Sequence, residues 1–132
     1  MTTEALVCAA VVVRAGHLLL VRRRVAEGCL SWQLPAGKAE PEESAEVAAA
    51  REALEETGVL VEPVQYLGER VHPLTRRRMA YVACKFVSGE AHVVDADEIA
   101  QVAWAAPDEW SDLVPYGFAP MVQDYLASVE AC

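Results

Sequence analysis

Residues 37–59 read GKAEPEESAEVAAAREALEETGV. Ser44 suits a helix N-cap, because its hydroxyl can accept a hydrogen bond from a first-turn N–H. From Ala45 to Glu56 the chain has no glycine or proline and is rich in alanine, glutamate and leucine, which are strong helix formers. Gly58 suits the left-handed position that ends a helix. The pattern therefore predicts a helix from Ala45 to Glu56.

The predicted helix has two unlike faces, because an α-helix repeats every 3.6 residues. One face carries three carboxylates, those of Glu52, Glu55 and Glu56. The opposite face carries apolar side chains that we expect to pack against a sheet, namely Val47, Ala50 and Leu54. Like charges at these spacings repel one another, whereas a hard divalent cation that prefers oxygen ligands would bind them together. Taken alone, three such glutamates are more often a solvated acidic face.

The neighbours of these glutamates favour the metal site over the solvated face. The positions that matter are Gly37, Glu43, Arg51, Glu52, Glu55, Glu56, Gly58 and Val59. In residue type and spacing they resemble the Nudix box, and the chain resembles small MutT-like Nudix hydrolases. Ala53 departs from the box, being smaller than the usual aliphatic residue. The resemblance implies a single domain over residues 1–132, with an α/β fold: an α/β/α sandwich around a mixed β-sheet.

The resemblance also implies the cofactor and the residues that hold it. The cofactor is Mg²⁺ or Mn²⁺, with Glu55, Glu56 and the carbonyl of Gly37 among its ligands. Glu52 is either a further ligand or the base that activates water, and the sequence leaves both roles open. Arg51 is expected to pair with a carboxylate of the box, Glu43 being the first candidate.

A glutamate outside the box joins this set. Glu98 lies in the acidic run Asp95–Glu98, directly before an apolar stretch. MutT-like proteins often carry a glutamate in the loop before a late strand, so Glu98 is predicted to face the metal as a catalytic residue and ligand. The alternative is an ordinary acidic loop.

Substrate contacts are harder to place than metal ligands. Arginine suits bidentate contacts with phosphate, and Arg23 and Arg78 are candidates. Each belongs to a run of three arginines, 22–24 and 76–78, and solvated strand ends explain such runs equally well. Lys38, directly after the box glycine, is a further phosphate candidate. Tyr116 and Phe118 lie where the tail of the family often borders the base pocket.

Around the helix the chain alternates between strand and turn patterns. Two apolar runs, 5–14 and 17–24, are joined by Ala15-Gly16 and predict a hairpin. We expect the following elements before the helix: a loop at 25–31, a short strand at 32–34 and a turn at 35–37. After it we expect strands at 60–70 (broken near Pro63), 77–88 and 101–105, a helical turn at 107–110, and a terminal helix from 116 or 117 to 129. Its apolar stripe would comprise Met121, Val122, Tyr125 and Leu126.

Composition limits the class of protein. The chain has 132 residues, 54% of them apolar, and a net charge of −9. The acidity argues against a nucleic-acid groove, which needs a basic footprint. No apolar run approaches the ~20 residues that cross a bilayer, and Thr2, Thr3 and Glu4 do not resemble the basic start of a signal peptide. Four scattered cysteines suggest free thiols. We therefore expect a cytoplasmic protein with no membrane partner.

The predicted function is Mg²⁺-dependent cleavage of the diphosphate linkage in a nucleoside di- or triphosphate or related nucleotide, with release of a nucleoside monophosphate. The alternative is a non-enzymatic nucleotide-binding sensor on the same fold, although such proteins usually lose box glutamates. The chain contains no asparagine, the residue with which MutT proteins read 8-oxoguanine, so that substrate is not indicated. A homodimer is compatible with the family.

Overall fold

The computed structural model describes residues 5–27 and 30–130, so Cys29 and Cys132 lie outside the described residues. Its strands are β1 (Val7–Arg14), β2 (His17–Glu27), β3 (Leu30–Gln33), β4 (Ala36–Lys38), β5 (Leu60–Val71), β6 (Arg78–Ser88) and β7 (Ile99–Ala105). Its helices are α1 (Ala45–Thr57), the 3₁₀ turn η1 (Pro107–Glu109), α2 (Trp110–Leu113) and α3 (Pro120–Glu130).

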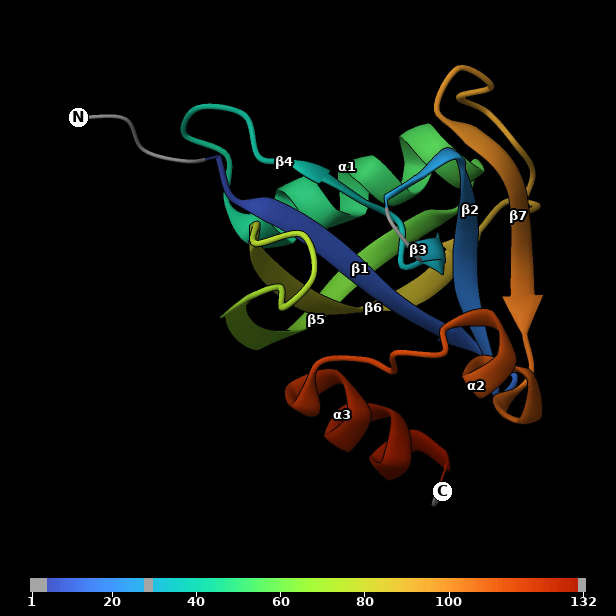
Figure 1. Ribbon diagram of the computed structural model, residues 1–132. Coiled ribbons are helices and arrows are strands. Elements are labelled where there is room, and N and C mark those ends of the chain that lie inside the picture. Colours follow the sequence, from blue (N-terminus) through green and yellow to red (C-terminus); the bar gives the residue numbers. More distant parts are fainter. Residues whose placement is uncertain (1–4, 28–29, 131–132) are drawn as a thin grey trace.

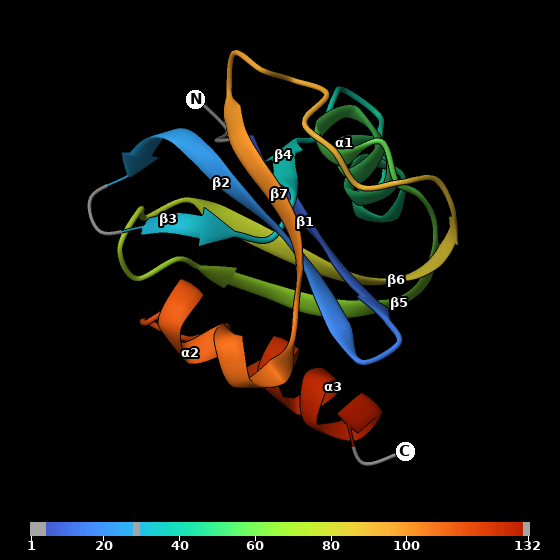
Figure 2. The same cartoon turned by 90° about the vertical axis from the view of Figure 1, so that its right-hand side faces the viewer.

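Within the described ranges, the strands form a seven-stranded mixed sheet. Its main path runs β3-β2-β1-β6-β5, with β4 added to β1 and β7 added to β2. The β1–β6 pair is parallel and the other pairs are antiparallel. Helix α1 covers one face, while α2 and α3 lie on the other (Figures 1 and 2). The predicted α/β/α sandwich with a mixed sheet is therefore confirmed.

The first two strands pair only at their shared turn and then diverge. Their register joins Val13 to Leu18 and Arg14 to His17. Beyond that point β4 pairs with the first residues of β1, from Val7 to Ala9, and β3 pairs with the last residues of β2. The divergence inserts the segment that leads into α1 directly beside β1, which carries Gly37 to the sheet.

The core has one layer under each group of helices. Under α1 the fully buried residues include Ala48, Ala49 and Ala53 of the helix itself. The prediction that Val47 and Leu54 pack against the sheet is wrong, since they are 56% and 45% exposed. The small alanine side chains let the helix axis approach the sheet closely, and this turns the larger residues outward. Ala50, the third residue predicted for that face, is half-buried beside this core.

Three predicted boundaries are also wrong. The stretch 25–31 was expected to be a loop, but β2 continues to Glu27 and β3 begins at Leu30, because the two strands pair there. Residues 36–38 form a strand rather than a turn, because β1 supplies their backbone partners. The last helix begins at Pro120 rather than at residue 116 or 117. Proline fits this first turn, because the N–H that it lacks would have no partner within the helix.

Other local predictions are confirmed. Ser44 accepts a hydrogen bond from the N–H of Val47 at 3.1 Å, and Gly58 ends α1 with φ of 75°. The pairing of β5 with β6 shifts register between Pro63 and Gln65, as expected where a proline cannot donate to the sheet. The apolar stripe of α3 packs on the sheet face opposite α1, with Val122 and Leu126 buried and Met121 and Tyr125 half-buried.

Candidate active site

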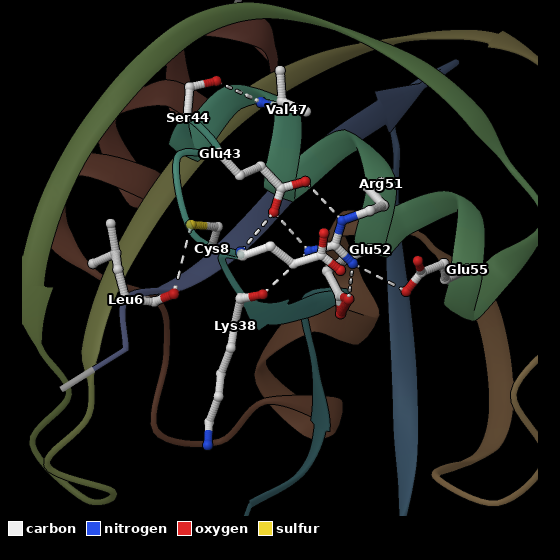
Figure 3. Close-up of polar contacts among 10 residues, drawn as sticks. Leu6, Cys8, Lys38, Glu43, Ser44, Val47, Arg51, Glu52 and Glu55 are labelled. Carbon is white, nitrogen blue, oxygen red and sulfur yellow. Dashed lines mark hydrogen bonds and ion pairs between the residues drawn. The ribbon is translucent and has the colours of Figure 1, made fainter.

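The guanidinium of Arg51 connects the loop before α1 with the acidic face of the helix. Its Nε and Nη2 donate to the two carboxylate oxygens of Glu43 at 2.7 and 2.8 Å. Its Nη1 donates to Glu52 at 2.8 Å and to Glu55 at 3.1 Å, and Nη2 also reaches the carbonyl of Lys38 at 3.2 Å. Figure 3 shows the carboxylates gathered around this one side chain. The predicted Arg51–Glu43 pair is therefore present, in bidentate form.

The hydrogen bonds to Arg51 hold Glu43 ionised. They are the largest cause that lowers the pKa of Glu43 to about 2, and a backbone N–H bond from Glu40 adds to them. The same pairing raises the pKa of Arg51. Glu43 therefore serves the site as a permanent anion that fixes the guanidinium, which in turn orients Glu52 and Glu55.

Gly37 is required by the position of Glu52. A Cβ placed on Gly37 would overlap the carboxylate of Glu52, which lies directly over the glycine. The close approach brings the backbone of β4 and the acidic face of α1 together. The backbone of a residue predicted as a metal ligand therefore adjoins the carboxylate of another.

The most buried carboxylate of the site is that of Glu56, which is 8% exposed. Its Oε1 accepts a hydrogen bond from the N–H of Ala36 at 3.2 Å. Burial, and then the charge of Glu52, raise the pKa of Glu56 to about 8. Burial is also the main cause that raises the pKa of Glu52, against the opposing effect of Arg51. The helix thus holds carboxylates whose negative charge the protein only partly compensates.

These side chains border a cavity of about 600 Å³ on the sheet face that carries α3. The acidic side chains of its lining are those of Glu40, Glu52, Glu55, Glu56, Asp95 and Glu98. Its basic part is formed by Arg23, Lys38, Arg51, Arg70 and Arg77. Apolar and aromatic side chains complete the wall, among them Trp32, Leu34, Met79, Tyr81, Val114 and Phe118. The cavity combines anionic, cationic and apolar surfaces within the size range of small-molecule sites.

Most residues predicted for the site meet at this cavity. They are Arg23, Gly37, Lys38, Arg51, Glu52, Glu55, Glu56, Glu98 and Phe118. Glu98 lines the cavity. It forms an ion pair with Arg23, whose Nη2 is 3.3 Å from the carboxylate of Glu98. Arg78 does not line the cavity and instead pairs with Glu69 at 3.0 Å. Tyr116 is also outside its lining and is 58% exposed.

Several lining residues were not predicted as site residues, chief among them Arg70 and Tyr81. They come from β5 and β6, and the register that pairs Arg70 with Met79 places them on the cavity face. The alternation of each strand was readable in the sequence, but the register between the strands was not.

The donor set fits a hard divalent cation. Carboxylate and carbonyl oxygens are the ligands that Mg²⁺ prefers, and Glu52, Glu55, Glu56 and the backbone of Gly37 supply them beside the cavity. Burial raises the pKa values of Glu52 and Glu56, and Arg51 beside Glu52 offsets this only in part, so an added cation would stabilise both ionised carboxylates. In the part of the chain that the structure describes, no three acidic, histidine or cysteine side chains already converge on one ion position. Among the same residues, no helix is both long and apolar enough to cross a bilayer.

Comparison with known proteins identifies the family. The model of the NUDIX domain matches residues 3–125. A MutT-like protein from Streptomyces ambofaciens is 36% identical over 120 residues, which cover 89% of this chain and 74% of the relative. The NAD-capped RNA hydrolase NudC from Salmonella heidelberg is 29% identical over 126 residues, and the match covers 94% of this chain but only 49% of that protein.

Among solved structures, the fold is similar to that of a NUDIX hydrolase from Nitrosomonas europaea. The TM-score is 0.75 at 25% identity, and the match covers 98% of this chain and 90% of the other. The family match spans nearly the whole chain, and it agrees with the glutamate-bearing helix and the mixed sheet. The chain therefore belongs to the NUDIX domain family, as a MutT-like Nudix hydrolase.

Proposed function

We propose that the protein is a Mg²⁺- or Mn²⁺-dependent hydrolase that cleaves the diphosphate linkage of a nucleoside di- or triphosphate or a related nucleotide. The observation that carries the proposal is the meeting of Gly37 with the acidic face of α1 at one edge of a cavity of about 600 Å³. The cavity extends from these oxygen donors to apolar and aromatic walls. Such a cavity suits a molecule with a charged diphosphate at one end and a flat ring at the other.

The chemistry requires neutralisation of the diphosphate charge and a positioned water. A bound divalent cation supplies charge neutralisation and lowers the pKa of water. Glu55, Glu56 and the carbonyl of Gly37 would hold it, and Glu98, which lines the same cavity, would be a further ligand. Arg51, through its hydrogen bonds, keeps the carboxylate of Glu55 and the neighbouring carboxylate of Glu52 in place.

Arg23 and Lys38 would contact the phosphate oxygens, because both line the cavity. The ion pair of Arg23 with Glu98 shows that a guanidinium from β2 reaches the acidic part. Phe118 would border the base, since it lies on the cavity wall at the start of the tail segment. A nucleoside monophosphate is the expected product.

The experiment is a hydrolysis assay over a panel of nucleoside di- and triphosphates and dinucleotides with Mg²⁺, Mn²⁺ or a chelator, with the products identified. A dinucleotide with a diphosphate bridge belongs on it because one relative is an NAD-capped RNA hydrolase. We expect metal-dependent release of a nucleoside monophosphate. Glu55→Gln and Glu56→Gln should each lower kcat by about 100-fold or more, the scale for loss of one electrostatic contact to the transition state.

Glu62→Gln is the matched control, because Glu62 is exposed on β5 and does not line the cavity. It should leave the rate unchanged. Turnover of no compound on the panel, or full activity in Glu56→Gln, would contradict the proposal. The two roles open to Glu52 are separated by combining this assay with thermal unfolding in the presence and absence of Mg²⁺. Loss of a ligand in Glu52→Gln would weaken metal-induced thermal stabilisation, whereas loss of a base would lower kcat and leave that stabilisation intact.

A further inference from the structure

Arg70 lies on the side of the cavity remote from the glutamates of α1. The sheet register places it opposite Met79 of β6, Met79 opposite Val7 of β1, and Val7 opposite Lys38 of β4. Neighbouring strands are about 4.8 Å apart, so three spacings separate the backbones of Arg70 and Lys38 by roughly 14 Å. That separation exceeds the span of one diphosphate group. Arg70 is therefore placed to contact the part of a nucleotide that lies beyond the phosphates.

The guanidinium of Arg70 is fixed but has no charged partner among residues 5–27 and 30–130. Its Nε donates to the hydroxyl of Tyr81 at 3.2 Å, and its Cζ is 5.9 Å from the centre of the same ring. No acidic side chain in those ranges forms an ion pair with it. The terminal nitrogens thus keep donors available at the cavity wall.

Its surroundings favour a ring over a phosphate as the occupant. Arg70 is half-buried, whereas Lys38 and Arg77, which also line the cavity, are exposed. Met79 and Tyr81 line the cavity together with Arg70. Met79 is half-buried and Tyr81 is buried. A flat, largely apolar ring with a polar edge matches this combination. A phosphate would be better solvated beside the exposed side chains of Lys38 and Arg77.

We propose that Arg70 is a specificity-determining residue that reads the edge of the nucleobase. This inference rests on the proposed function in that it takes the cavity as a nucleotide site. A guanidinium donates hydrogen bonds and accepts none, so it selects a base with two adjacent acceptors. Guanine presents O6 and N7 in this way, and cytosine presents O2 and N3. Adenine and uracil place a donor beside each acceptor on their polar edges, so they receive one bond instead of two.

Tyr81 acts on this contact as a positioning residue. Its hydroxyl holds Nε and so leaves the terminal nitrogens to face the ligand. Tyr81→Phe removes that acceptor and keeps the ring. The base preference should then weaken while the affinity for the disfavoured bases stays the same, which a merely structural role for Tyr81 would not produce.

The test is calorimetric binding of GMP, CMP, AMP and UMP, which needs no hydrolysis. We expect the wild type to bind GMP or CMP more tightly than AMP and UMP by about 5- to 150-fold, the range for one bidentate arginine contact with a base. The comparison of GMP with CMP shows which ring the cavity fits. Arg70→Lys keeps the charge and loses the planar fork, so it should bring the four affinities together.

Arg22→Lys is the control, because Arg22 is exposed on β2 and does not line the cavity. It should keep the wild-type order. Equal binding of all four nucleotides by the wild type, or an unchanged order in Arg70→Lys, would overturn the proposal. So would an equal loss for all four in Arg70→Gln that Arg70→Lys restores, since that pattern means contact with an anion. A clear base preference without hydrolysis of any nucleoside triphosphate would instead contradict the hydrolase function alone.

Discussion

Glu56 provides a quantitative test of the electrostatics of the site. Its carboxylate is 8% exposed and its pKa is raised to about 8, from an ordinary 4.5, chiefly by burial. Between these two values the folded protein binds more protons than the unfolded chain, so the free energy of unfolding must fall as the pH rises. For the metal-free protein, this one group should remove roughly 3 kcal/mol of stability between pH 5 and pH 8.

The perturbation is Glu56→Gln, which keeps an oxygen to accept the N–H of Ala36 and removes the titration. Urea unfolding in the presence of a chelator, followed by tryptophan fluorescence, measures the free energy of both proteins at several pH values. Titrating groups remote from Glu56 act almost equally in both proteins, so the difference between them reports Glu56 together with its interaction with Glu52. We expect the variant to gain roughly 3 kcal/mol on the wild type as the pH rises from 5 to 8.

At pH 8 without metal, the variant should be the more stable of the two proteins. Added Mg²⁺ should make the wild type the more stable one. A ligand that binds only the folded state raises its stability by mass action, and the variant lacks one carboxylate of the predicted set. Parallel pH profiles of the two metal-free proteins would refute the argument that burial raises the pKa of Glu56. The carboxylate would then be solvated or compensated in the folded protein.

Three further predictions follow from the geometry. Gly37→Ala should lower kcat by about 100-fold with little change in the circular dichroism spectrum, because the added methyl displaces Glu52 from its position; wild-type activity would contradict the close approach. Ala49→Leu should destabilise the protein by about 1–3 kcal/mol in urea unfolding, whereas Val47→Lys should change it by less than about 0.5 kcal/mol; the reverse order would mean that α1 buries its other face. Glu43→Gln should make unfolding less sensitive to acid between about pH 4.5 and pH 2, since stability due to an ionised Glu43 is present above this window and lost as the pH falls through it.

Helix α1 shows which features of the site could be predicted from neighbouring residues alone. Its cap at Ser44, its end at Gly58 and the common side of Glu52 and Glu55 depend on residues a few positions apart, and all were readable from the sequence. Its buried face was not. A run of alanines has nearly the same hydrophobicity on every side, so the periodicity favoured Val47 and Leu54, while close packing on the sheet selected Ala48, Ala49 and Ala53.

The sequence by itself determined that this chain carries a capped helix with a cluster of carboxylates, because those features depend on helical geometry and neighbouring residues, while the pairing of Arg51 was expected from the family resemblance. Only the tertiary structure decided which carboxylate is buried and which distant residues share its cavity. The family resemblance pointed to Glu98 and Phe118, whereas Arg70 and Tyr81 were found at that cavity only in the structure. Their meeting depends on strand register and on how the layers pack, and both are set by contacts between residues far apart in the chain.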